Sequence, residues 1–555
     1  MFKETTNQSS LFDAEIYLPD ALPENDWSFT FRDKILHLID ENKFRALYSE
    51  KEGRPNASIK IMVSILIFIG LEKLTWRAAE FQYSRRIDWL ITTHTEVGKA
   101  SIDHTTLFKF YQRLETNDVA RELFVTLTKK FAELCGSSLK KQRTDSFFIH
   151  GWLQILSRYG LFKETIRKFL LTLRKQKPGL YENIKGHLSK NYLDKDFDLT
   201  EKDKELACRC TALMVHDLYK IITAFQNHNQ IKHYETFKIL SQVFIQQCEV
   251  KDAPDNKDPE IIIKEKPAKK AINTPHNPEA QYVRKVKQRV TGDRGFATET
   301  CDPDNKTQFI TDVAVTEATE HDSTQQPEIR KRLIENELQP EKQYADAGFV
   351  NGETIIESKK NGVDLEGSTA GRSQSFESYR ADDRPLDAGD FDTTYCEETG
   401  ELVVNKCPGG QVPENQGRSK KTGKINMHFD PALCNLCAKK ERCPARFGKR
   451  VTTYTVTEQE FIGAQRHHKY MQDAAYRKEC AIRAGAESLV SELTRAHGMR
   501  KSRHRKRRRT NLQLIFAALA CNVKRFIAHG DNYGYVSPET VQMSLKPAYL
   551  FNNSF

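Results

Sequence analysis

Residues 308–317 have the sequence Gln-Phe-Ile-Thr-Asp-Val-Ala-Val-Thr-Glu, and this stretch decides the fold. Apolar and polar side chains alternate along it, as they do along residues 293–300, and a period of two is typical of β-strands. Residues 301–305 separate the two segments and contain Pro303 between two aspartates, which favours a turn. The sequence therefore predicts two strands that form a hairpin.

Further elements on both sides of this hairpin indicate a larger sheet. The sequence predicts a strand over residues 144–149, a helix over 327–337, a strand that ends at Tyr344-Ala345-Asp346, a helix over about 351–360 and a strand over 363–365. Strands and helices in this order are typical of an α/β fold. We therefore expect an α/β protein with a mixed sheet.

The flanking segments have other compositions. Residues 1–136 show helical periodicity, which a DNA-binding bundle and a plain scaffold explain equally well. Residues 150–250 are also helical in pattern, whereas residues 251–280 carry five prolines among mixed charges, as in a linker or an extended surface arm. Residues 368–450 are polar and rich in glycine, and residues 456–528 return to a helical pattern.

Composition excludes some classes of protein. The chain has 555 residues, 38% of them hydrophobic, which excludes a wholly disordered chain. The net charge of +11 permits nucleic acid or an anionic membrane as a partner. The best apolar run, residues 61–71, is far shorter than the roughly 20 residues that span a bilayer. The first residues show no apolar signal-peptide core, so we expect a cytoplasmic protein with no membrane partner.

A cysteine cluster gives the strongest spacing signal. Cys407 is followed by Cys434 and Cys437, which form a CxxC knuckle, and then by Cys443. Four thiolates satisfy tetrahedral Zn²⁺ and leave no open position for a substrate, so the predicted zinc site is structural. Cys396 could replace one of the four ligands, and free cysteines in a polar loop are the alternative.

A basic run gives the second signal. It contains nine lysines and arginines and no acidic residue: Arg495, Arg500, Lys501, Arg503, Arg505, Lys506, Arg507, Arg508 and Arg509. DNA phosphates attract such a segment strongly, with a steep dependence on salt. We predict that this run binds nucleic acid, and a solvated or targeting-like segment is the alternative.

Motifs of several other chemistries are missing from the sequence. It contains no GxxxxGK[ST] phosphate loop, no HExxH, no GxSxG and no GxGxxG after a strand. The first of these absences argues against ATP hydrolysis. His467 and His468 are neighbours on a predicted helix and point about 100° apart, so they are poor joint ligands.

Short blocks spread along the chain form a recognisable set. They are Gly53-Arg54-Pro55, Asp103-His104-Thr105-Thr106-Leu107, Arg143-Thr144-Asp145-Ser146, Glu299-Thr300-Cys301-Asp302, Ile310-Thr311-Asp312-Val313, Ala318-Thr319-Glu320-His321-Asp322, Tyr344-Ala345-Asp346-Ala347-Gly348-Phe349, Arg483-Ala484-Gly485-Ala486-Glu487, Asn511-Leu512-Gln513 and Ala520-Cys521-Asn522-Val523-Lys524-Arg525. With the cysteine cluster, this set resembles the DDE transposases of bacterial insertion sequences, which are mobile elements. The resemblance is closest to the eleven-eighty-two insertion-sequence family.

The resemblance implies a fold and an active site. The fold would be RNase H-like, with a helical insertion, an all-α N-terminal domain before it and a small zinc-ribbon-like insertion before the last catalytic helix. Asp145, Asp346 and Glu487 would be the catalytic acids, with Arg483 in support on the same helical face as Glu487. Two Mg²⁺ or Mn²⁺ ions about 3.5–4 Å apart would relieve the repulsion of the three carboxylates. Such a site would cut DNA at the transposon ends and transfer the strands into target DNA.

The resemblance also suggests how the chain is divided. The expected parts are an N-terminal helical domain that binds DNA (1–136), a catalytic core in two pieces (137–149 and 281–380), a helical insertion with a proline-rich linker (150–280), a cysteine-rich zinc insertion (381–455), C-terminal core helices with the basic run (456–530) and a tail (531–555).

By the same resemblance, the partner is double-stranded DNA, both the terminal inverted repeats and the target. A homodimer or higher oligomer would bind it, and the cytoplasmic protein would then be associated with the nucleoid. The alternative is a catalytically degenerate or repurposed DNA-binding protein that derives from such a transposase. Intact Asp145, Asp346 and Glu487 argue against this alternative.

Overall fold

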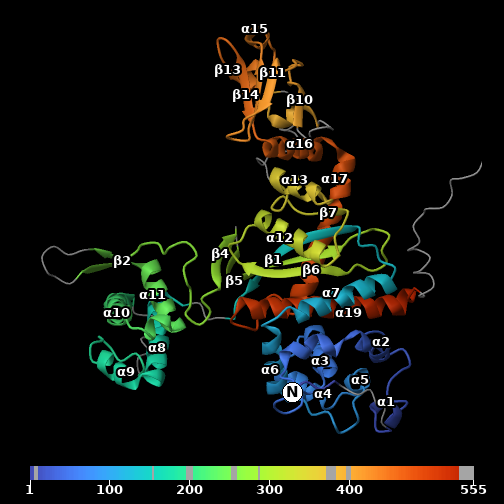
Figure 1. Cartoon of the computed structure of the whole chain (residues 1–555), viewed down its shortest axis with the longest axis vertical. Coiled ribbons are helices and arrows are strands. Elements are labelled where there is room, and N and C mark those ends of the chain that lie inside the picture. The colour runs from blue at the N-terminus through green and yellow to red at the C-terminus, as the bar shows by residue number, and fades with distance from the viewer. Residues whose placement is uncertain are drawn as a thin grey trace, which may run out of the picture.

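The computed structural model describes residues 1–4, 11–152, 156–194, 204–251, 259–285, 288–369, 383–395 and 402–536. Figure 1 shows a central sheet with helices on both faces, a helical arm at its side and a small β-rich region at one end. The protein is therefore mixed α/β with a helical N-terminal region. Cys396, the possible substitute zinc ligand, lies outside the described residues.

The central sheet contains the predicted hairpin. Its strands are β1 (Lys141–His150), β4 (Gln281–Lys285), β5 (Gln288–Thr300), β6 (Ile310–Glu317), β7 (Lys342–Tyr344) and β8 (Asp364–Glu366). β1 lies between β5, to which it is antiparallel, and β7, to which it is parallel. β4 and β6 are both antiparallel to β5, and β8 is parallel to β7. The prediction of a mixed sheet is therefore confirmed.

Helices cover both faces of this sheet (Figure 1). α12 (Asp322–Glu335) contacts β6, and α13 (Gly352–Lys360) contacts β8. α7 (Val119–Leu134) and α19 (Arg507–Tyr533) lie between the sheet and the N-terminal helices, and both contact β6. The sheet is thus held between layers of helices.

The N-terminal region is helical, as its periodicity predicts. It contains α1 (Ala14–Tyr17), α2 (Trp27–Lys34), α3 (Ile59–Glu72), α4 (Trp76–Tyr83), α5 (Ile87–Thr92), α6 (His104–Leu114) and α7, with 3-10 turns at Leu36–Leu38 and Glu41–Leu47. α3 carries the apolar run and is largely buried, and the Ser58 hydroxyl caps it by accepting from the Ile61 N–H. Asp103 caps α6 in the same way through the Thr105 N–H.

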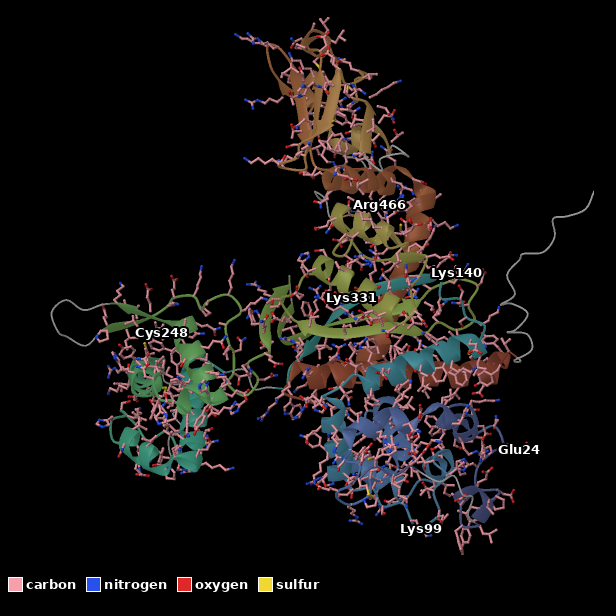
Figure 2. The ribbon with its side chains drawn as sticks, in the orientation of Figure 1. Glu24, Lys99, Lys140, Cys248, Lys331 and Arg466 are labelled. Carbon is pink, nitrogen blue, oxygen red and sulfur yellow. The ribbon has the colours of Figure 1, made fainter. Side chains whose placement is uncertain are left out.

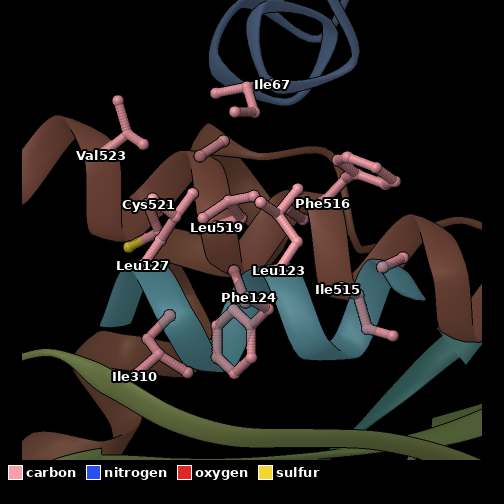
Figure 3. Close-up of a cluster of buried hydrophobic side chains, with 14 of the residues drawn as sticks. Ile67, Leu123, Phe124, Leu127, Ile310, Ile515, Phe516, Leu519, Cys521 and Val523 are labelled. Atoms are coloured by element: carbon pink, nitrogen blue, oxygen red, sulfur yellow. The ribbon is translucent and has the colours of Figure 1, made fainter. Parts of the chain in front are cut away.

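One continuous core joins these helices to the sheet. Figure 3 shows Ile67 of α3, Leu123 of α7, Leu519 of α19 and Ile310 of β6 in the same buried cluster. Because α19 contacts α3, α7 and β6, it joins α7 in linking the N-terminal helices to the sheet.

Two asparagines fix α19 along β6. Asn511 and Asn522 are about three turns apart and therefore lie on one face of the helix. The Asn522 Oδ1 accepts from the Ile310 N–H at 2.8 Å, and the Asn511 Oδ1 accepts from the Val315 N–H at 3.0 Å. The two asparagines in the C-terminal blocks thus bond directly to the strand backbone.

The helical arm stands beside the sheet (Figure 1). It contains α8 (Arg158–Gln176), α9 (Pro178–Lys185), α10 (Lys204–Phe225), a 3-10 turn at Ile231–His233, α11 (Glu235–Gln247) and the hairpin of β2 (Cys248–Lys251) and β3 (Glu260–Ile263). Its buried side chains form a hydrophobic core separate from that of the sheet. The predicted linker over residues 251–280 is therefore wrong in part, because β3 pairs with β2 there.

The cysteine region has more regular structure than its polar composition predicts. It contains β9 (Asp392–Tyr395), β10 (Leu402–Lys406), β11 (Asn415–Arg418), β12 (Ile425–Phe429), α15 (Pro431–Asn435), β13 (Arg446–Phe447) and β14 (Thr452–Val456), with 3-10 turns at Ala388–Asp390 and Lys440–Arg442. These strands form two small sheets around buried Val404, Met427 and Phe429.

A helical segment connects this region back to the sheet. It consists of α16 (Glu458–Gln472), α17 (Ala474–Cys480), a 3-10 turn at Ala481–Ala484, α18 (Gly485–Ser491) and a π-turn at Glu492–Ala496. Arg466 of α16, labelled in Figure 2, forms an ion pair of 2.8 Å with Glu366 at the end of β8. Among the helices in the described part of the chain, none combines the length and apolar character that crossing a bilayer requires.

Candidate active site

Strand pairing brings Asp145 and Asp346 together. β1 and β7 run parallel, with Arg143 opposite Tyr344. Each aspartate lies two residues beyond this pair: Asp145 continues β1, whereas Asp346 follows the end of β7, close enough for its charge to act on Asp145. Both side chains are half-buried. The structure thus places two of the three predicted catalytic acids at one point on the sheet.

The environment of Asp145 disfavours its negative charge. Burial is the main cause, and together with the charges of Asp346 and Asp322 it raises the pKa of Asp145 to about 6. A hydrogen bond from the Ser146 N–H and the positive charge of Arg483 act in the opposite direction. A carboxylate in such surroundings is stabilised by any cation placed beside it.

Asp322 is a third acidic residue at this point, and it is not among the site residues predicted from the sequence. It is the first residue of α12, and its Oδ2 pairs with Arg294 of β5 at 2.6 Å. A Cβ atom on Gly348 would lie 2.8 Å from the Asp322 Oδ2 and 3.0 Å from the Asp346 Oδ1. Gly348 therefore lies between the carboxylate of Asp322 on α12 and that of Asp346 in its own segment, and the Asp346 Oδ1 accepts from the Gly348 N–H at 2.9 Å.

Arg294 connects Asp322 to the strand that carries Asp145. Its guanidinium donates to the Ser146 Oγ at 2.9 Å and to the Glu320 carbonyl at 2.8 Å. It also lies over the rings of Phe148 and Phe296. Both partners of the Arg294–Asp322 pair are buried. Asp322 stood in one of the quoted sequence blocks, but only the folded chain shows that its partner lies on β5.

Glu487 is placed on α18, which contacts β1 and β5. Arg143 lies two residues before Asp145 and so on the same face of β1. Its guanidinium donates to the Ile482 carbonyl at 3.0 Å and lies against Gly485, where a Cβ atom would come within 1.9 Å of it. The face of β1 that carries Asp145 therefore packs against the helical segment that carries Glu487.

Arg483 lies close to Asp145, whereas Glu487 does not contact either aspartate. Arg483 is close enough to Asp145 for its charge to lower the pKa of that residue. The Glu487 side chain is exposed one turn further along, and in the described structure it forms no hydrogen bond or ion pair with either aspartate. The structure thus brings Asp346 and Arg483 close to Asp145, whereas the Glu487 side chain is exposed on α18 and is not brought into contact with them.

Tight groups of metal-binding side chains occur elsewhere. Within the described ranges, three sets have all their ligand atoms within 4.8 Å of one another: Glu492 with His497 and Cys521, Glu80 with Asp103 and His104, and Asp387 with Asp390 and His468. Neither the three predicted catalytic acids nor the four cysteines form so tight a set in this part of the chain. Carboxylate oxygens are nevertheless the donors that Mg²⁺ prefers, so Asp145 and Asp346 suit that ion chemically.

The four cysteines converge on one place. Cys434 and Cys437 are joined by a turn in which the Cys437 N–H donates to the Cys434 carbonyl at 3.3 Å. A Cβ atom on Gly409 would lie 2.8 Å from the Cys437 Sγ and 3.6 Å from the Cys407 Sγ. Burial and the charges of the other thiolates raise the pKa of Cys443. The arrangement suits a soft cation such as Zn²⁺, which would remove this repulsion.

The basic run divides into two groups. Arg503, Arg507 and Arg509 are half-buried and bond within the protein: Arg503 to the Lys73 carbonyl at 2.8 Å, Arg507 to Asp293 at 3.0 Å and Arg509 to Glu115 at 2.7 Å. The other six side chains are exposed: Arg495, Arg500, Lys501, Arg505, Lys506 and Arg508. The run contains no acid of its own, but the fold supplies acids from distant segments.

Two protein-family models match the chain. One, described as Transposase DDE domain, matches residues 406–527, and the other, described as Transposase domain (DUF772), matches residues 17–113. The first match contains Glu487 and the four cysteines, whereas Asp145 and Asp346 lie before it. Searches of curated proteins and of solved structures gave no match. The two family matches indicate a transposase of the DDE type, which implies action on DNA and the use of divalent metal ions.

Proposed function

We propose that this protein cuts DNA at the ends of its own mobile element and joins the freed ends to target DNA. The observation that carries the proposal is the pair Asp145 and Asp346, which the pairing of β1 with β7 brings within reach of each other's charge. The family matches support the reaction type, and Glu487 on the adjacent α18 completes the set of three acids. The resemblance to the eleven-eighty-two family belongs to this proposal.

Asp145, Asp346 and Glu487 would together hold two Mg²⁺ or Mn²⁺ ions. When bound, the ions supply positive charge to the attacking and leaving oxygens of a phosphodiester. In this proposal the exposed Glu487 side chain turns toward the aspartates when the ions bind. Arg294 and Asp322 hold the strand and turn on which the acids stand, because they bond to Ser146 and lie against Gly348.

Two displacements at phosphorus would follow each other at this site. In the first, water attacks the phosphodiester at the element end, and the 3′-oxygen leaves as a hydroxyl. In the second, that hydroxyl attacks a phosphodiester of the target, whose own 3′-oxygen leaves. Arg483 beside Asp145 is positioned to neutralise a non-bridging phosphate oxygen in both steps.

The strand order supports an RNase H-like core. β6, β5 and β1 are successive antiparallel neighbours, and β7 and β8 continue the sheet in the parallel sense. In this proposal the helical arm is an insertion after the first strand, and the cysteine region is an insertion before the helix of Glu487. The division of the chain that the resemblance suggests stays a prediction in its exact limits.

The cysteine region would bind one structural Zn²⁺ through Cys407, Cys434, Cys437 and Cys443. The convergence of the four thiols and the CxxC turn support this assignment. The ion would stabilise a region whose own hydrophobic core is small.

The exposed cations of the basic run would contact DNA phosphates, and the N-terminal helices would add a second contact surface. Terminal repeats and target are the proposed binding sites. A dimer or higher oligomer would hold two ends at once, and the protein would work in the cytoplasm, bound to the nucleoid.

A nicking assay tests the proposed function. A plasmid that carries this gene with its flanking DNA is incubated with the full-length protein and Mg²⁺ or Mn²⁺. We expect metal-dependent cuts at fixed positions in the flanks, and loss of these cuts in Asp346→Asn with DNA binding retained. Asp364→Asn, which changes an exposed aspartate of β8, is the matched control and should cut normally. Binding without cutting in the wild type would favour the degenerate DNA-binding protein instead.

A further inference from the structure

A mostly apolar cavity of about 280 Å³ lies where the N-terminal helices, α19 and residues 500–506 meet. Residues 500–506, a part of the basic run that precedes α19, are called the basic loop below. Its walls include Trp76 of α4, Tyr111 of α6, His504 of the basic loop and Phe516 of α19. Trp152, which follows β1, lines the same cavity and is 50% exposed. The volume is slightly below the range of about 300–1,000 Å³ that is usual for drug-sized ligands, so a smaller flat ligand suits it.

Aromatic rings form one wall of this cavity. The Tyr111 and His504 rings are stacked with their centroids 4.9 Å apart, and Trp76 meets Tyr111 edge-on at 5.2 Å. Burial, with help from neighbouring arginines, lowers the pKa of His504 to about 4, so its ring is neutral near pH 7. Rings in this arrangement offer a stacking surface to a planar aromatic ligand.

Lys501 connects the cavity to other exposed cations through Trp152. The Lys501 Nζ lies 5.1 Å from the centroid of the Trp152 ring, and Arg500 and Arg505 are exposed on the same loop. Apolar rings next to exposed cations match the two parts of a nucleotide, because the base stacks and the phosphate carries negative charge.

The cavity is also connected to the strand that carries Asp145. Lys501 forms a parallel β-bridge with His150, the last residue of β1, and the Ser502 N–H donates to the His150 carbonyl at 2.7 Å. His150 is the fifth residue after Asp145 along the strand, a distance of roughly 17 Å at about 3.3 Å per residue. One DNA strand covers that distance in roughly five nucleotides at 3.4 Å each.

We propose that this cavity receives a single nucleobase, unstacked from DNA, with its ring against Trp152 and the aromatic wall. This inference rests on the proposed function, because the occupant is part of the DNA that the protein would cut. The base would lie about five nucleotides from the phosphodiester at Asp145. Its neighbouring phosphates would contact Lys501, Arg500 and Arg505.

Two 30-base-pair duplexes of the same mixed sequence test the proposal. One is fully paired, and the other has a single adenine opposite an abasic site, so that this adenine leaves the stack easily. Fluorescence anisotropy gives the Kd of each for the full-length protein without added Mg²⁺ or Mn²⁺. Stacking of a base on aromatic side chains contributes on the order of 1–3 kcal/mol, so we expect the duplex with the unpaired adenine to bind roughly tenfold more tightly.

Variants identify the side chain responsible. Trp152→Ala should reduce the ratio of the two Kd values to about one, and Trp152→Phe should restore most of it. Phe81→Ala is the matched control, since Phe81 is also an exposed aromatic residue, 54% accessible, with the Arg85 guanidinium 3.8 Å from its ring, and lies outside the cavity. That variant should keep the wild-type ratio.

The outcomes separate the two proposals. Equal Kd values in the wild type, or an unchanged ratio in Trp152→Ala, would overturn the nucleobase site even if the plasmid is cut. A Trp152-dependent preference without plasmid cutting would support the nucleobase site and count against the proposed activity. Absence of binding to both duplexes would overturn both.

Discussion

The aspartate pair on the sheet and the cysteine cluster beyond it are two candidate metal sites with different construction. Asp145 and Asp346 come from segments on either side of the helical arm, and the pairing of β1 with β7 brings them together. The cysteines come from one short segment, and tight turns such as the one from Cys434 to Cys437 gather them. Strands with a large hydrophobic core support the acids, whereas the cysteine region has little core to hold its thiols in place.

Removal of zinc should have the largest effect and should stay within the cysteine region. Structural Zn²⁺ contributes on the order of 10 kcal/mol to small domains that have little core. We expect a chelator, or Cys437→Ser, to expose residues 402–456 to protease while the sheet stays protected. Limited proteolysis with mass spectrometry checks this, and Cys208→Ser, an exposed cysteine of α10, is the control. Protection that survives chelation would contradict the zinc site.

Arg294→Met should lower the free energy of unfolding of the sheet, whether or not a metal ion is present. It removes the Arg294 guanidinium from its ion pair with the buried Asp322 carboxylate, and breaking a buried pair by removing one member typically costs about 3–5 kcal/mol. Denaturant unfolding measures the loss. Lys331→Met, at an exposed lysine labelled in Figure 2, should change the free energy of unfolding by less than about 0.5 kcal/mol. Equal stability of the two variants would show that the buried pair does not support the site.

Gly348→Ala should misplace the acids while the fold survives. The new Cβ atom would press on the carboxylates of Asp322 and Asp346. A displacement of about 1 Å at a catalytic centre can cost roughly a hundredfold in rate, and we expect that loss in the plasmid assay. Gly179→Ala in α9, where a Cβ atom would meet nothing within 4 Å, is the control. Normal cutting by Gly348→Ala would show that a Cβ atom at position 348 does not displace the catalytic acids.

The exposed and the internally bonded arginines of the basic run should behave differently. Replacing Arg505, Lys506 and Arg508 with alanine removes up to three phosphate contacts, so the slope of log K against log salt should fall by roughly 2–3. Replacing Arg503, Arg507 and Arg509 should lower stability more than it changes that slope. Salt titrations of DNA binding, with thermal unfolding of both triple variants, measure the contrast. The same slope in both variants would contradict the division.

A pH dependence should be the smallest effect. Burial and two neighbouring acids raise the pKa of Asp145 to about 6 in the folded protein. Without a bound metal ion, the folded protein therefore binds a proton at Asp145 more tightly than the unfolded chain does. The wild type should therefore gain stability relative to Asp145→Asn as the pH falls from 7 to 4.5, and lose it again as the pH rises through 6. We expect a difference of about 1–2 kcal/mol in denaturant unfolding. If the difference in the free energy of unfolding between the two proteins does not change with pH, burial and the neighbouring acids do not raise the pKa of Asp145.

Patterns that repeat along the chain were predictable from the sequence. The hairpin of β5 and β6, the strand β7 before Asp346 and the N-terminal helices follow from alternation and helical periodicity. The hairpin of β2 and β3 was missed because prolines dominate its surroundings. The small sheets of the cysteine region were missed because their strands are short and polar.

Of the site, the sequence determined the residue types and their order: Asp145, Asp346, Glu487, the cysteines and the basic run. Only the tertiary structure decided which residues meet. It put Asp322 and Arg294 beside the aspartates, and it paired three of the basic residues with acids from other segments. The physical reason is range. Periodicity and spacing act over a few residues of chain, whereas burial and ion pairing depend on contacts between segments that are far apart in sequence.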